Sequence, residues 1–250
     1  MAGSMESNQT RARSRVALVT GAGRGIGAAT ALALADQGHR VALVSRTLSE
    51  VQTVAAEITK RHGAGRAFAM VADVSSVKDV DSVFQEIASL WGPVEVLVNN
   101  AGVIARQPFV EMPIETFDLI QAVNVRGPFL CSQRLFKGLQ GTGLPGSIVN
   151  ISSLGGIRST QKFEGFSAYV ASKHAVVGLT ESLAVEGKPL GIRVNCVAPG
   201  AVATKMLRDA VPFLKTSTNP EDIAEIIVYL SDETRSKSLN GVVIEVNSNE

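Results

Sequence analysis

A tyrosine and a lysine stand four residues apart in Tyr169-Val170-Ala171-Ser172-Lys173, near the start of a segment with helical period. Residues at i and i+4 project from one face of a helix, so the phenol of Tyr169 and the ammonium of Lys173 can cooperate. A phenol with its ordinary pKa of about 10 exchanges protons poorly at neutral pH unless a nearby positive charge stabilises the phenolate. The spacing predicts a proton-transfer pair, although a Tyr and a Lys on one helix face are more often a surface pair.

Two serines follow a short apolar run upstream of this pair. The run from Ser147 to Ile151 is expected to be a buried strand, and it ends at Ser152 and Ser153. In folds with parallel strands, ligands bind at the carboxyl ends of the strands. We therefore interpret Ser153 as a donor to the oxygen of a substrate carbonyl. The alternatives are that Ser152 does this, or that both are ordinary residues of a polar turn.

A glycine-rich turn, Thr20-Gly21-Ala22-Gly23-Arg24-Gly25-Ile26-Gly27, follows the first apolar run. Glycines allow a sharp turn and a close approach to a pyrophosphate, and the next helix offers free N–H groups and the positive end of its dipole. The turn predicts a dinucleotide site with Gly21, Gly25, Ile26 and Gly27 as cofactor residues. Its spacing differs from G-x-G-x-x-G, so a simple strand-to-helix connection is the alternative for the turn taken alone.

Two arginines are expected at the adenosine end of this site. The second predicted strand ends at Ser45-Arg46, where no Asp or Glu stands to accept hydrogen bonds from the adenosine ribose. A carboxylate there would repel a 2′-phosphate, whereas the guanidinium of Arg46 suits one, and Arg24 can approach the same group. The pair predicts NADP(H) rather than NAD(H), although two solvated loop arginines are the commoner situation in general.

Short apolar runs alternate with longer segments of helical period along the chain. Several of the runs are apolar without alternation, which indicates strands that are buried on both faces. We therefore expect an α/β fold with a single-domain doubly wound parallel sheet (Rossmann fold), of about seven strands with helices on both faces. The expected strands are Val16–Thr20, Val41–Ser45, Ala67–Val71, Val94–Val98, Ser147–Ile151, Arg193–Val197 and Val242–Val246. The expected helices are Gly25–Gln37, Leu48–His62, Val77–Trp91, Ile114–Leu139, Ala168–Gly187 and Pro220–Leu230.

The composition excludes several classes of protein. Of the 250 residues, 45% are apolar and 19% charged, and the formal net charge is +1, which argues against a nucleic-acid-binding surface. No stretch reaches the roughly 18 apolar residues of a membrane span. Only Cys131 and Cys196 are present, and no Cys or His pair has metal-ligand spacing, so we expect a cytoplasmic protein without a metal. Residues 1–14 are expected to be a disordered segment that begins with a vector-derived remnant, and residues 15–250 the dinucleotide-binding and catalytic domain.

From Val16 to about Val246 the sequence resembles the short-chain dehydrogenase/reductase family. Besides the glycine turn and the Tyr-x-x-x-Lys segment, it contains other motifs of the family in the family's order. These are Asp73-Val74 after the third expected strand, Asn99-Asn100-Ala101-Gly102 after the fourth, Asn124, and Pro199-Gly200 with Thr204 after the sixth.

The resemblance implies a catalytic tetrad of Ser153, Tyr169, Lys173 and Asn124. In the family's scheme Tyr169 donates a proton while hydride arrives from the nicotinamide, Ser153 orients the carbonyl, and Asn124 helps to hold a water that connects Lys173 to solvent. Lys173 also reaches the hydroxyls of the nicotinamide ribose. The remaining motifs are implied to flank the adenine, support the cofactor or contact its nicotinamide side. They are, in that order, Asp73 and Val74; Asn100, Ala101 and Gly102; and Pro199, Gly200, Val202 and Thr204.

Two features depart from the family pattern. The gap between Ser153 and Tyr169 is a few residues longer than usual, so we expect a protruding loop at 158–166, and Ser152 remains an alternative to Ser153. The segment 204–220, which in the family forms a movable lid over the substrate, is shorter than in many members.

The resemblance is closest to the branch that contains 3-oxoacyl-[acyl-carrier-protein] reductases, which implies reduction of a β-keto acyl group or a related ketone with NADPH. The expected partners are a small carbonyl or alcohol substrate, which can be a carrier-bound acyl thioester, and further copies of the chain in a homotetramer or homodimer. Two other classes stay open. One is a catalytically idle NADPH-binding regulatory protein, against which Tyr169 and Lys173 argue. The other is a lyase similar to halohydrin dehalogenases, against which Lys173 and the glycine turn argue.

Overall fold

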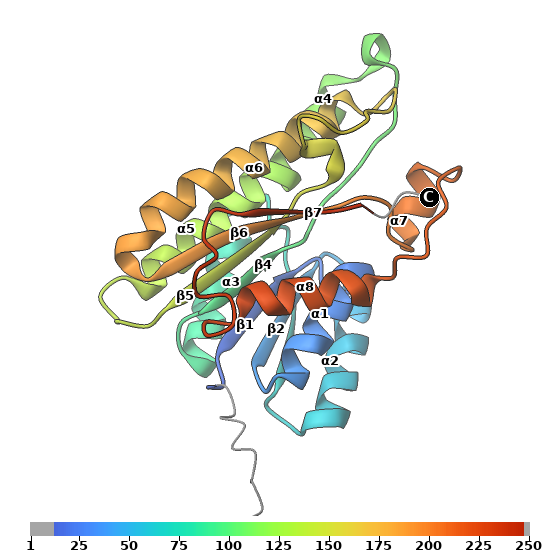
Figure 1. Cartoon of the computed structure of the whole chain (residues 1–250). Coiled ribbons are helices and arrows are strands. Elements are labelled where there is room, and N and C mark those ends of the chain that lie inside the picture. The colour runs from blue at the N-terminus through green and yellow to red at the C-terminus, as the bar shows by residue number, and fades with distance from the viewer. Residues whose placement is uncertain (1–12, 248–250) are drawn as a thin grey trace, which may run out of the picture.

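The computed structural model describes residues 13–247, which form one seven-stranded sheet (Figure 1). All neighbouring strands are parallel, and their order is β3-β2-β1-β4-β5-β6-β7. This order confirms the expected doubly wound sheet. The strands are β1 (Val16–Thr20), β2 (Arg40–Ser45), β3 (Ala67–Val71), β4 (Val96–Asn99), β5 (Gly146–Ile151), β6 (Ile192–Pro199) and β7 (Val243–Val246).

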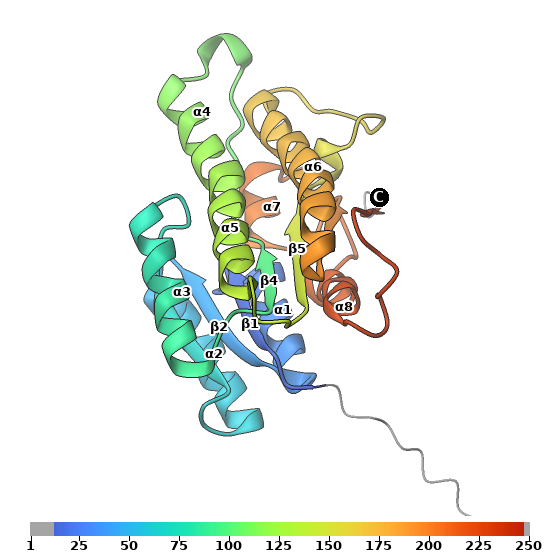
Figure 2. The ribbon, with the colours of Figure 1, turned by 90° about the vertical axis from the view of Figure 1, so that its left-hand side faces the viewer.

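Helices cover both faces of the sheet (Figure 2). One layer contains α1, α2 and α8, and the opposite layer contains α3, α5 and α6. The α-helices are α1 (Gly25–Asp36), α2 (Leu48–His62), α3 (Val77–Trp91), α4 (Ile114–Gln121), α5 (Gly127–Leu139), α6 (Ser167–Gly187), α7 (Lys205–Ala210) and α8 (Pro220–Ser231). Shorter turns are η1 (Phe109–Glu111), the π-helical η2 (Ala122–Arg126), η3 (Leu154–Gly156) and η4 (Lys188–Leu190).

The sheet is buried on both faces, as its uninterrupted apolar strands predict. Successive side chains of a strand point to opposite faces, so Ala17 and Val19 pack under the α1 layer while Val16 and Leu18 pack under the α3 layer. All four are at most 2% exposed. Burial on both faces removes the polar-apolar alternation of a half-exposed sheet and explains why these strands are apolar throughout.

The structure differs from the expected elements in two places that border the site. The single helix expected over 114–139 is divided by the π-helical turn η2, at which the buried amide of Asn124 bonds to the backbone of Val103. Such π-turns commonly interrupt α-helices at functional sites, and this one is directly followed by Gly127-Pro128, where the proline has no N–H to continue the helix. The short helix α7 was not expected, because only six residues form it.

The amino ends of the strands are held by a buried arginine. Arg15, only 2% exposed, donates to the carbonyl oxygens of Ser231, Glu95 and Pro145 at 2.9–3.0 Å, and so connects β1 to the ends of neighbouring elements. A buried guanidinium is tolerated because these oxygens and the carboxylate of Glu95 compensate for lost water. The backbone N–H of Arg15 donates to Nδ1 of His39 at 3.2 Å.

Two expectations concern the ends of the chain and membranes. No helix within residues 13–247 is long and apolar enough to cross a membrane. The disordered segment expected at 1–14 falls mainly on residues 1–12, which lie outside the described residues. Arg13 is described, and its guanidinium is bonded to Glu95.

We predict that His39 makes stability depend on pH. Burial, and then the charge of Arg15, lower the pKa of His39 from 6.5 to about 4. Between these values the unfolded chain binds a proton that the folded chain does not, so this contribution is present above pH 6.5 and is lost as the pH falls towards 4. The loss should be on the order of 3 kcal/mol at most.

Urea unfolding of the wild type and of His39→Asn at about pH 7 and about pH 4.5, on either side of the ordinary histidine pKa, measures this effect. The introduced carboxamide offers an acceptor oxygen but does not titrate, so the variant should lose less stability than the wild type on acidification. Equal losses in the two proteins would show that carboxylates, not His39, cause the acid sensitivity.

Candidate active site

The site lies where the strand order reverses, between the carboxyl ends of β1 and β4. The hydroxyl of Thr20 accepts the N–H groups of Asn100 and Ala101, both at 3.1 Å. The amide of Asn100 in turn donates to the carbonyl oxygens of Thr20 and Gly21, at 2.9 and 3.1 Å. These bonds fix the glycine turn against the loop that follows β4.

The glycine turn depends on the absence of side chains. Gly21 and Gly25 have φ of 64° and 55°, a region that favours glycine. A Cβ at Gly27 would lie 2.3 Å from the carbonyl oxygen of Gly21 and 2.5 Å from Nδ2 of Asn100, so only glycine lets α1 approach β1 here. The first turn of α1 carries no acidic residue, and its N–H groups and dipole favour an anion at this point.

A cavity of about 580 Å³ extends from the glycine turn to α6 and the segment around α7. Of the predicted site residues, Gly27 and Asn124 are buried outside its lining, and all the others line it. The lining residues are Gly21, Arg24, Gly25, Ile26, Arg46, Asp73, Val74, Asn100, Ala101, Gly102, Ser153, Tyr169, Lys173, Pro199, Gly200, Val202 and Thr204.

Ser153, Tyr169 and Lys173 come together at one part of this cavity. The hydroxyl of Ser153 and the ring of Tyr169 both border Gly155, and Nζ of Lys173 lies 5.6 Å from the centre of the Tyr169 ring. Nζ also donates to the carbonyl oxygen of Ile151 at 2.8 Å, which places the ammonium beside the end of β5. The spacing of four residues on α6 therefore produces the shared face that the sequence predicts.

Burial changes the acidity of both members of the pair. Loss of water raises the pKa of Tyr169, and the nearby hydroxyl of Ser153 opposes this rise. Lys173 is 5% exposed, and burial lowers its pKa from 10.5 to about 8. Both shifts favour the uncharged form, as expected for groups taken out of water. The phenol keeps its proton, and the amine titrates close to neutral pH.

The structure separates the two serines that the sequence leaves as alternatives. Successive residues at the end of β5 point to opposite sides. Ser152 is 3% exposed and its hydroxyl donates to the carbonyl oxygen of Lys173 at 2.8 Å, where it joins β5 to α6. Ser153 instead faces Tyr169. The geometry therefore favours Ser153 as the residue that contacts a carbonyl.

Asn124 connects three elements of the site. Its Oδ1 accepts the N–H of Val103 at 2.8 Å, and its Nδ2 donates to the carbonyl oxygen of Val103 at 2.9 Å and to the hydroxyl of Ser172 at 3.0 Å. A Cβ at Gly102 would lie 3.4 Å from Oδ1 of Asn124 and 3.7 Å from Nζ of Lys173, so these atoms border one small space. The water assigned to Asn124 stays a prediction.

A carboxylate lies at the adenosine end of the cavity, although no acidic residue directly follows β2. Glu50, in the first turn of α2, lines the cavity and pairs with Arg24, with 3.0 Å between Oε1 and Nη1. Arg46 is exposed and lies in no ion pair within residues 13–247. The end of β2 itself carries no acidic residue, as expected, but the next helical turn brings a carboxylate to the same part of the cavity. Sequence reasoning missed Glu50 because it searched the end of the strand and not the next helical turn.

The opposite end of the cavity is mostly apolar. Its lining there comes from the segment before α6 and from the segment around α7, with the aromatic side chains of Phe163 and Phe166. Phe163 packs edge-on against Phe213 with 6.1 Å between ring centres, and the guanidinium of Arg106 lies 5.6 Å from the Phe213 ring. The aliphatic residues at this end are Val103, Ile104, Leu154, Val170, Met206, Leu207, Val211 and Leu214.

Comparison with known proteins agrees with this geometry. The family model described as short chain dehydrogenase matches residues 15–214. The chain belongs to the short-chain dehydrogenase/reductase family. It is thus an oxidoreductase with a nicotinamide dinucleotide cofactor, NAD(P). Levodione reductase from Leifsonia aquatica is 34% identical over 230 residues, which cover 92% of this chain and 84% of that protein.

Solved structures of other family members have the same fold. The 3-ketoacyl-(acyl-carrier-protein) reductase from Brucella melitensis, complexed with NADH, has a TM-score of 0.85 and 33% identity, covering 93% of this chain and 96% of that one. A protein described as a putative NAD(P)-dependent gluconate 5-dehydrogenase from Beutenbergia cavernae, with bound NADP at low occupancy, has a TM-score of 0.82 and 34% identity, covering 94% and 96%.

The residues present in this family member fit the cofactor. The turn from Gly21 to Gly27 leaves no Cβ between the backbone and the cavity at its glycines, and Gly25 approaches Thr204 so closely that a Cβ there would lie 3.2 Å from Cγ2. One continuous cavity joins this turn to Tyr169 and Lys173. Within residues 13–247, no group of three or more His, Cys, Asp or Glu side chains is placed to hold a metal ion.

Proposed function

We propose that this chain is an NADPH-dependent ketone reductase, with a 3-oxoacyl group or a related ketone as substrate. The observation that carries the proposal is that Ser153, Tyr169 and Lys173 share one cavity with the glycine turn. A proton-transfer pair at one end and a phosphate-binding turn at the other match the two requirements of carbonyl reduction, which are a proton source and a bound dinucleotide.

The mechanism assigns one task to each side chain. When bound, the nicotinamide supplies hydride to the carbonyl carbon or, in the reverse direction, accepts it from the alcohol. Ser153 holds the carbonyl oxygen by a hydrogen bond, and the O–H of Tyr169 gives its proton to that oxygen, which becomes a hydroxyl. The ammonium of Lys173 stabilises the phenolate that remains on Tyr169. Asn124 fixes the loop after β4 against α6.

The substrate inference rests on the lining of the cavity beyond Tyr169. Aliphatic and aromatic side chains make up most of that end, with Gln161, Lys162, Lys205 and Arg208 also in the lining. Burial of an apolar substrate body against the apolar part is favourable, at about 25 cal/mol per Å² of apolar surface. This supports a β-keto acyl chain or another ketone with an apolar body, and it agrees with the 3-ketoacyl reductase and levodione reductase among the relatives.

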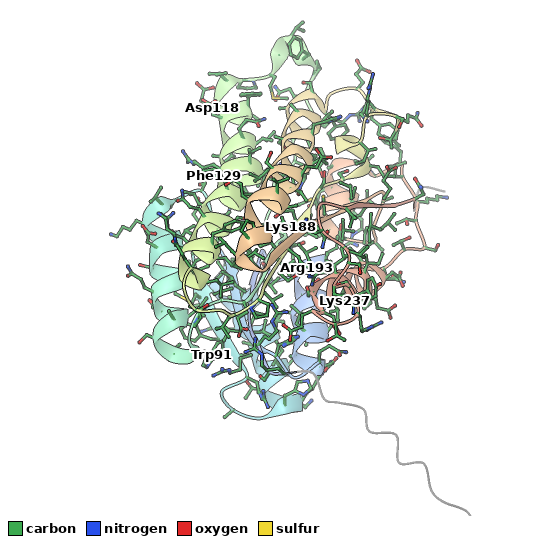
Figure 3. The ribbon with its side chains drawn as sticks, turned by 60° about the vertical axis from the view of Figure 1, so that its left-hand side comes forward. Trp91, Asp118, Phe129, Lys188, Arg193 and Lys237 are labelled. Atoms are coloured by element: carbon green, nitrogen blue, oxygen red, sulfur yellow. The ribbon has the colours of Figure 1, made fainter. Side chains whose placement is uncertain are left out.

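We also propose that the chain forms a homodimer or homotetramer. Large apolar side chains are exposed on η1, α4 and α5, including Phe129 (47%), which projects from α5 as Asp118 does from α4 (Figure 3). Exposed apolar surface of this kind commonly marks a contact between proteins.

Sedimentation velocity should give a mass of two or four chains, and a mass of one chain at micromolar concentration would contradict the assembly.

Tyr169→Phe is predicted to abolish most turnover and leave cofactor binding intact. The substitution removes only the hydroxyl, so kcat for ketone reduction should fall roughly 10²- to 10⁴-fold, the usual contribution of a positioned proton donor. The dissociation constant of NADPH should change by less than about twofold. Oxidation of NADPH with β-keto thioesters, diketones and cyclic ketones measures the first quantity, and fluorescence titration the second.

The matched control is Tyr229→Phe, which removes the other tyrosine hydroxyl of the chain. Tyr229 lies on α8 beside Arg235 and outside the cavity lining, so its loss should leave turnover unchanged. Full activity in Tyr169→Phe would refute the mechanism. NADPH binding without turnover of any ketone by the wild type would instead favour the idle regulatory protein.

Arg46→Asp is predicted to reverse the choice of cofactor. A carboxylate at the end of β2 repels a 2′-phosphate and can accept hydrogen bonds from ribose hydroxyls, so NADPH should bind more than about tenfold more weakly while NADH binding is kept or improved. Titration of both dinucleotides into Lys60→Asp, which makes the same charge change on the exposed face of α2, controls for net charge. Equal preference in Arg46→Asp and wild type would refute the role of Arg46.

A further inference from the structure

The ion pair between Arg24 and Glu50 occupies the adenosine end of the cavity. Arg24 comes from the glycine turn and Glu50 from the first turn of α2, and both line the cavity together with Ser45 and Arg46. The side chain of Glu50 is 33% exposed and that of Arg24 63% exposed, so the carboxylate is the more firmly enclosed partner. Its position therefore depends on what packs around it.

Gly23 makes the position of Glu50 possible. A Cβ at Gly23 would lie 2.6 Å from Cβ of Glu50, 2.8 Å from its Oε2 and 3.5 Å from Oγ of Ser45. A contact under 3.0 Å requires a shift, so any other residue at 23 would force Glu50 and the glycine turn apart. The carboxylate is thus packed directly against the turn that a dinucleotide must approach.

The two forms of the cofactor differ at this end of the molecule. NADPH carries a 2′-phosphate with a charge of about −1.5 to −2 at neutral pH, whereas NADH carries a hydroxyl. The phosphate needs cations, and one of the two arginines available is already neutralised by Glu50. The carboxylate of Glu50 also repels the 2′-phosphate of NADPH, whereas it does not repel the 2′-hydroxyl of NADH. Glu50 therefore acts against one cofactor and not against the other.

We propose that Glu50 is a specificity-determining residue that lowers the preference for NADPH over NADH by holding Arg24. The inference rests on the proposed function, because it requires a nicotinamide dinucleotide in the cavity. With Glu50 present, NADPH must separate the ion pair to use Arg24, and only Arg46 is freely available to it. NADH leaves the pair in place. The chain should consequently accept both cofactors more evenly than its two arginines alone indicate.

The expected size of the effect follows from the exposure of the pair. Ion pairs at a protein surface contribute about 0.2–1 kcal/mol, which corresponds to a factor of about 1.4 to 5 in a dissociation constant. Removing the repulsion between the carboxylate of Glu50 and the 2′-phosphate increases this factor further. Glu50→Gln, which keeps the shape of the side chain and removes its charge, should therefore tighten NADPH binding about three- to tenfold.

Isothermal titration calorimetry of wild type and Glu50→Gln tests the proposal with four probes: NADPH, NADH, 2′,5′-ADP and 5′-ADP. The two probes with a 2′-phosphate should bind about three- to tenfold more tightly to the variant, and the two without it should change by less than about twofold or bind more weakly. The matched control is Glu57→Gln on the same helix. Glu57 pairs with Arg61 at 2.7 Å and does not line the cavity, so all four probes should bind as to wild type.

Arg24→Gln separates pairing from general repulsion. If Glu50 acts by holding Arg24, then Glu50→Gln in the Arg24→Gln background should change NADPH binding by less than about twofold. An undiminished effect in that background, or equal changes for NADPH and NADH in the single variant, would overturn the inference while leaving the proposed function intact. Failure of folded wild type to bind either dinucleotide would overturn both.

Discussion

The arrangement of the site depends on the hydrogen bonds between the ends of β1 and β4. The backbone N–H of Asn100 donates to the hydroxyl of Thr20, and the side-chain amide of Asn100 donates to the carbonyl oxygen of Thr20. These bonds keep the glycine turn and the loop after β4 in one rigid unit. From that loop, Val103 bonds to Asn124, and Asn124 bonds to Ser172 on α6. A continuous polar network thus joins the glycine turn to α6, the helix that carries Tyr169 and Lys173. Because Thr20, Asn124 and Ser172 are buried with their polar groups paired, a shift of one element would leave such groups unpaired, which is costly.

Burial then gives the proposed catalytic pair, Tyr169 and Lys173, its acid–base properties. The phenol of Tyr169 has a raised pKa and keeps its proton, which is the form that carbonyl reduction requires. The pKa of Lys173 is lowered to about 8, so this amine changes charge near neutral pH. Bringing the two side chains together in water would produce neither shift. The apolar surroundings supplied by the covered sheet are therefore part of the chemistry, as is the nearby hydroxyl of Ser153, which opposes the shift of Tyr169.

The sequence predicts those features whose signal is local. Strands apolar on both faces, the glycine turn, and the four-residue spacing of Tyr169 and Lys173 follow from periodicity and residue type, and the structure has each of them. The apolar period over 114–139 continues through η2 and predicts one helix, although Pro128 directly after η2 is a residue that a helix interior disfavours. Ser152 and Ser153 cannot be ranked until the register of β5 is known. Glu50 was missed for the same reason, since its approach to Arg24 depends on how α2 packs against the turn.

The two ends of the cavity are built from different parts of the chain, and this allows them to vary separately. In the functions proposed here, cofactor choice depends on charges carried by the first turn of α2 and the glycine turn, which come close because Gly23 has no Cβ. Substrate choice depends on apolar contacts between the segments before α6 and around α7, where Phe163 meets Phe213. The side chains of Arg24 and Glu50 and those of Phe163 and Phe213 make none of the hydrogen bonds that join Thr20, Asn100, Asn124 and Ser172. A family fold can therefore keep one reaction while its substrate and its preferred dinucleotide change, because the residues that select them lie outside the bonds that hold the catalytic groups in place.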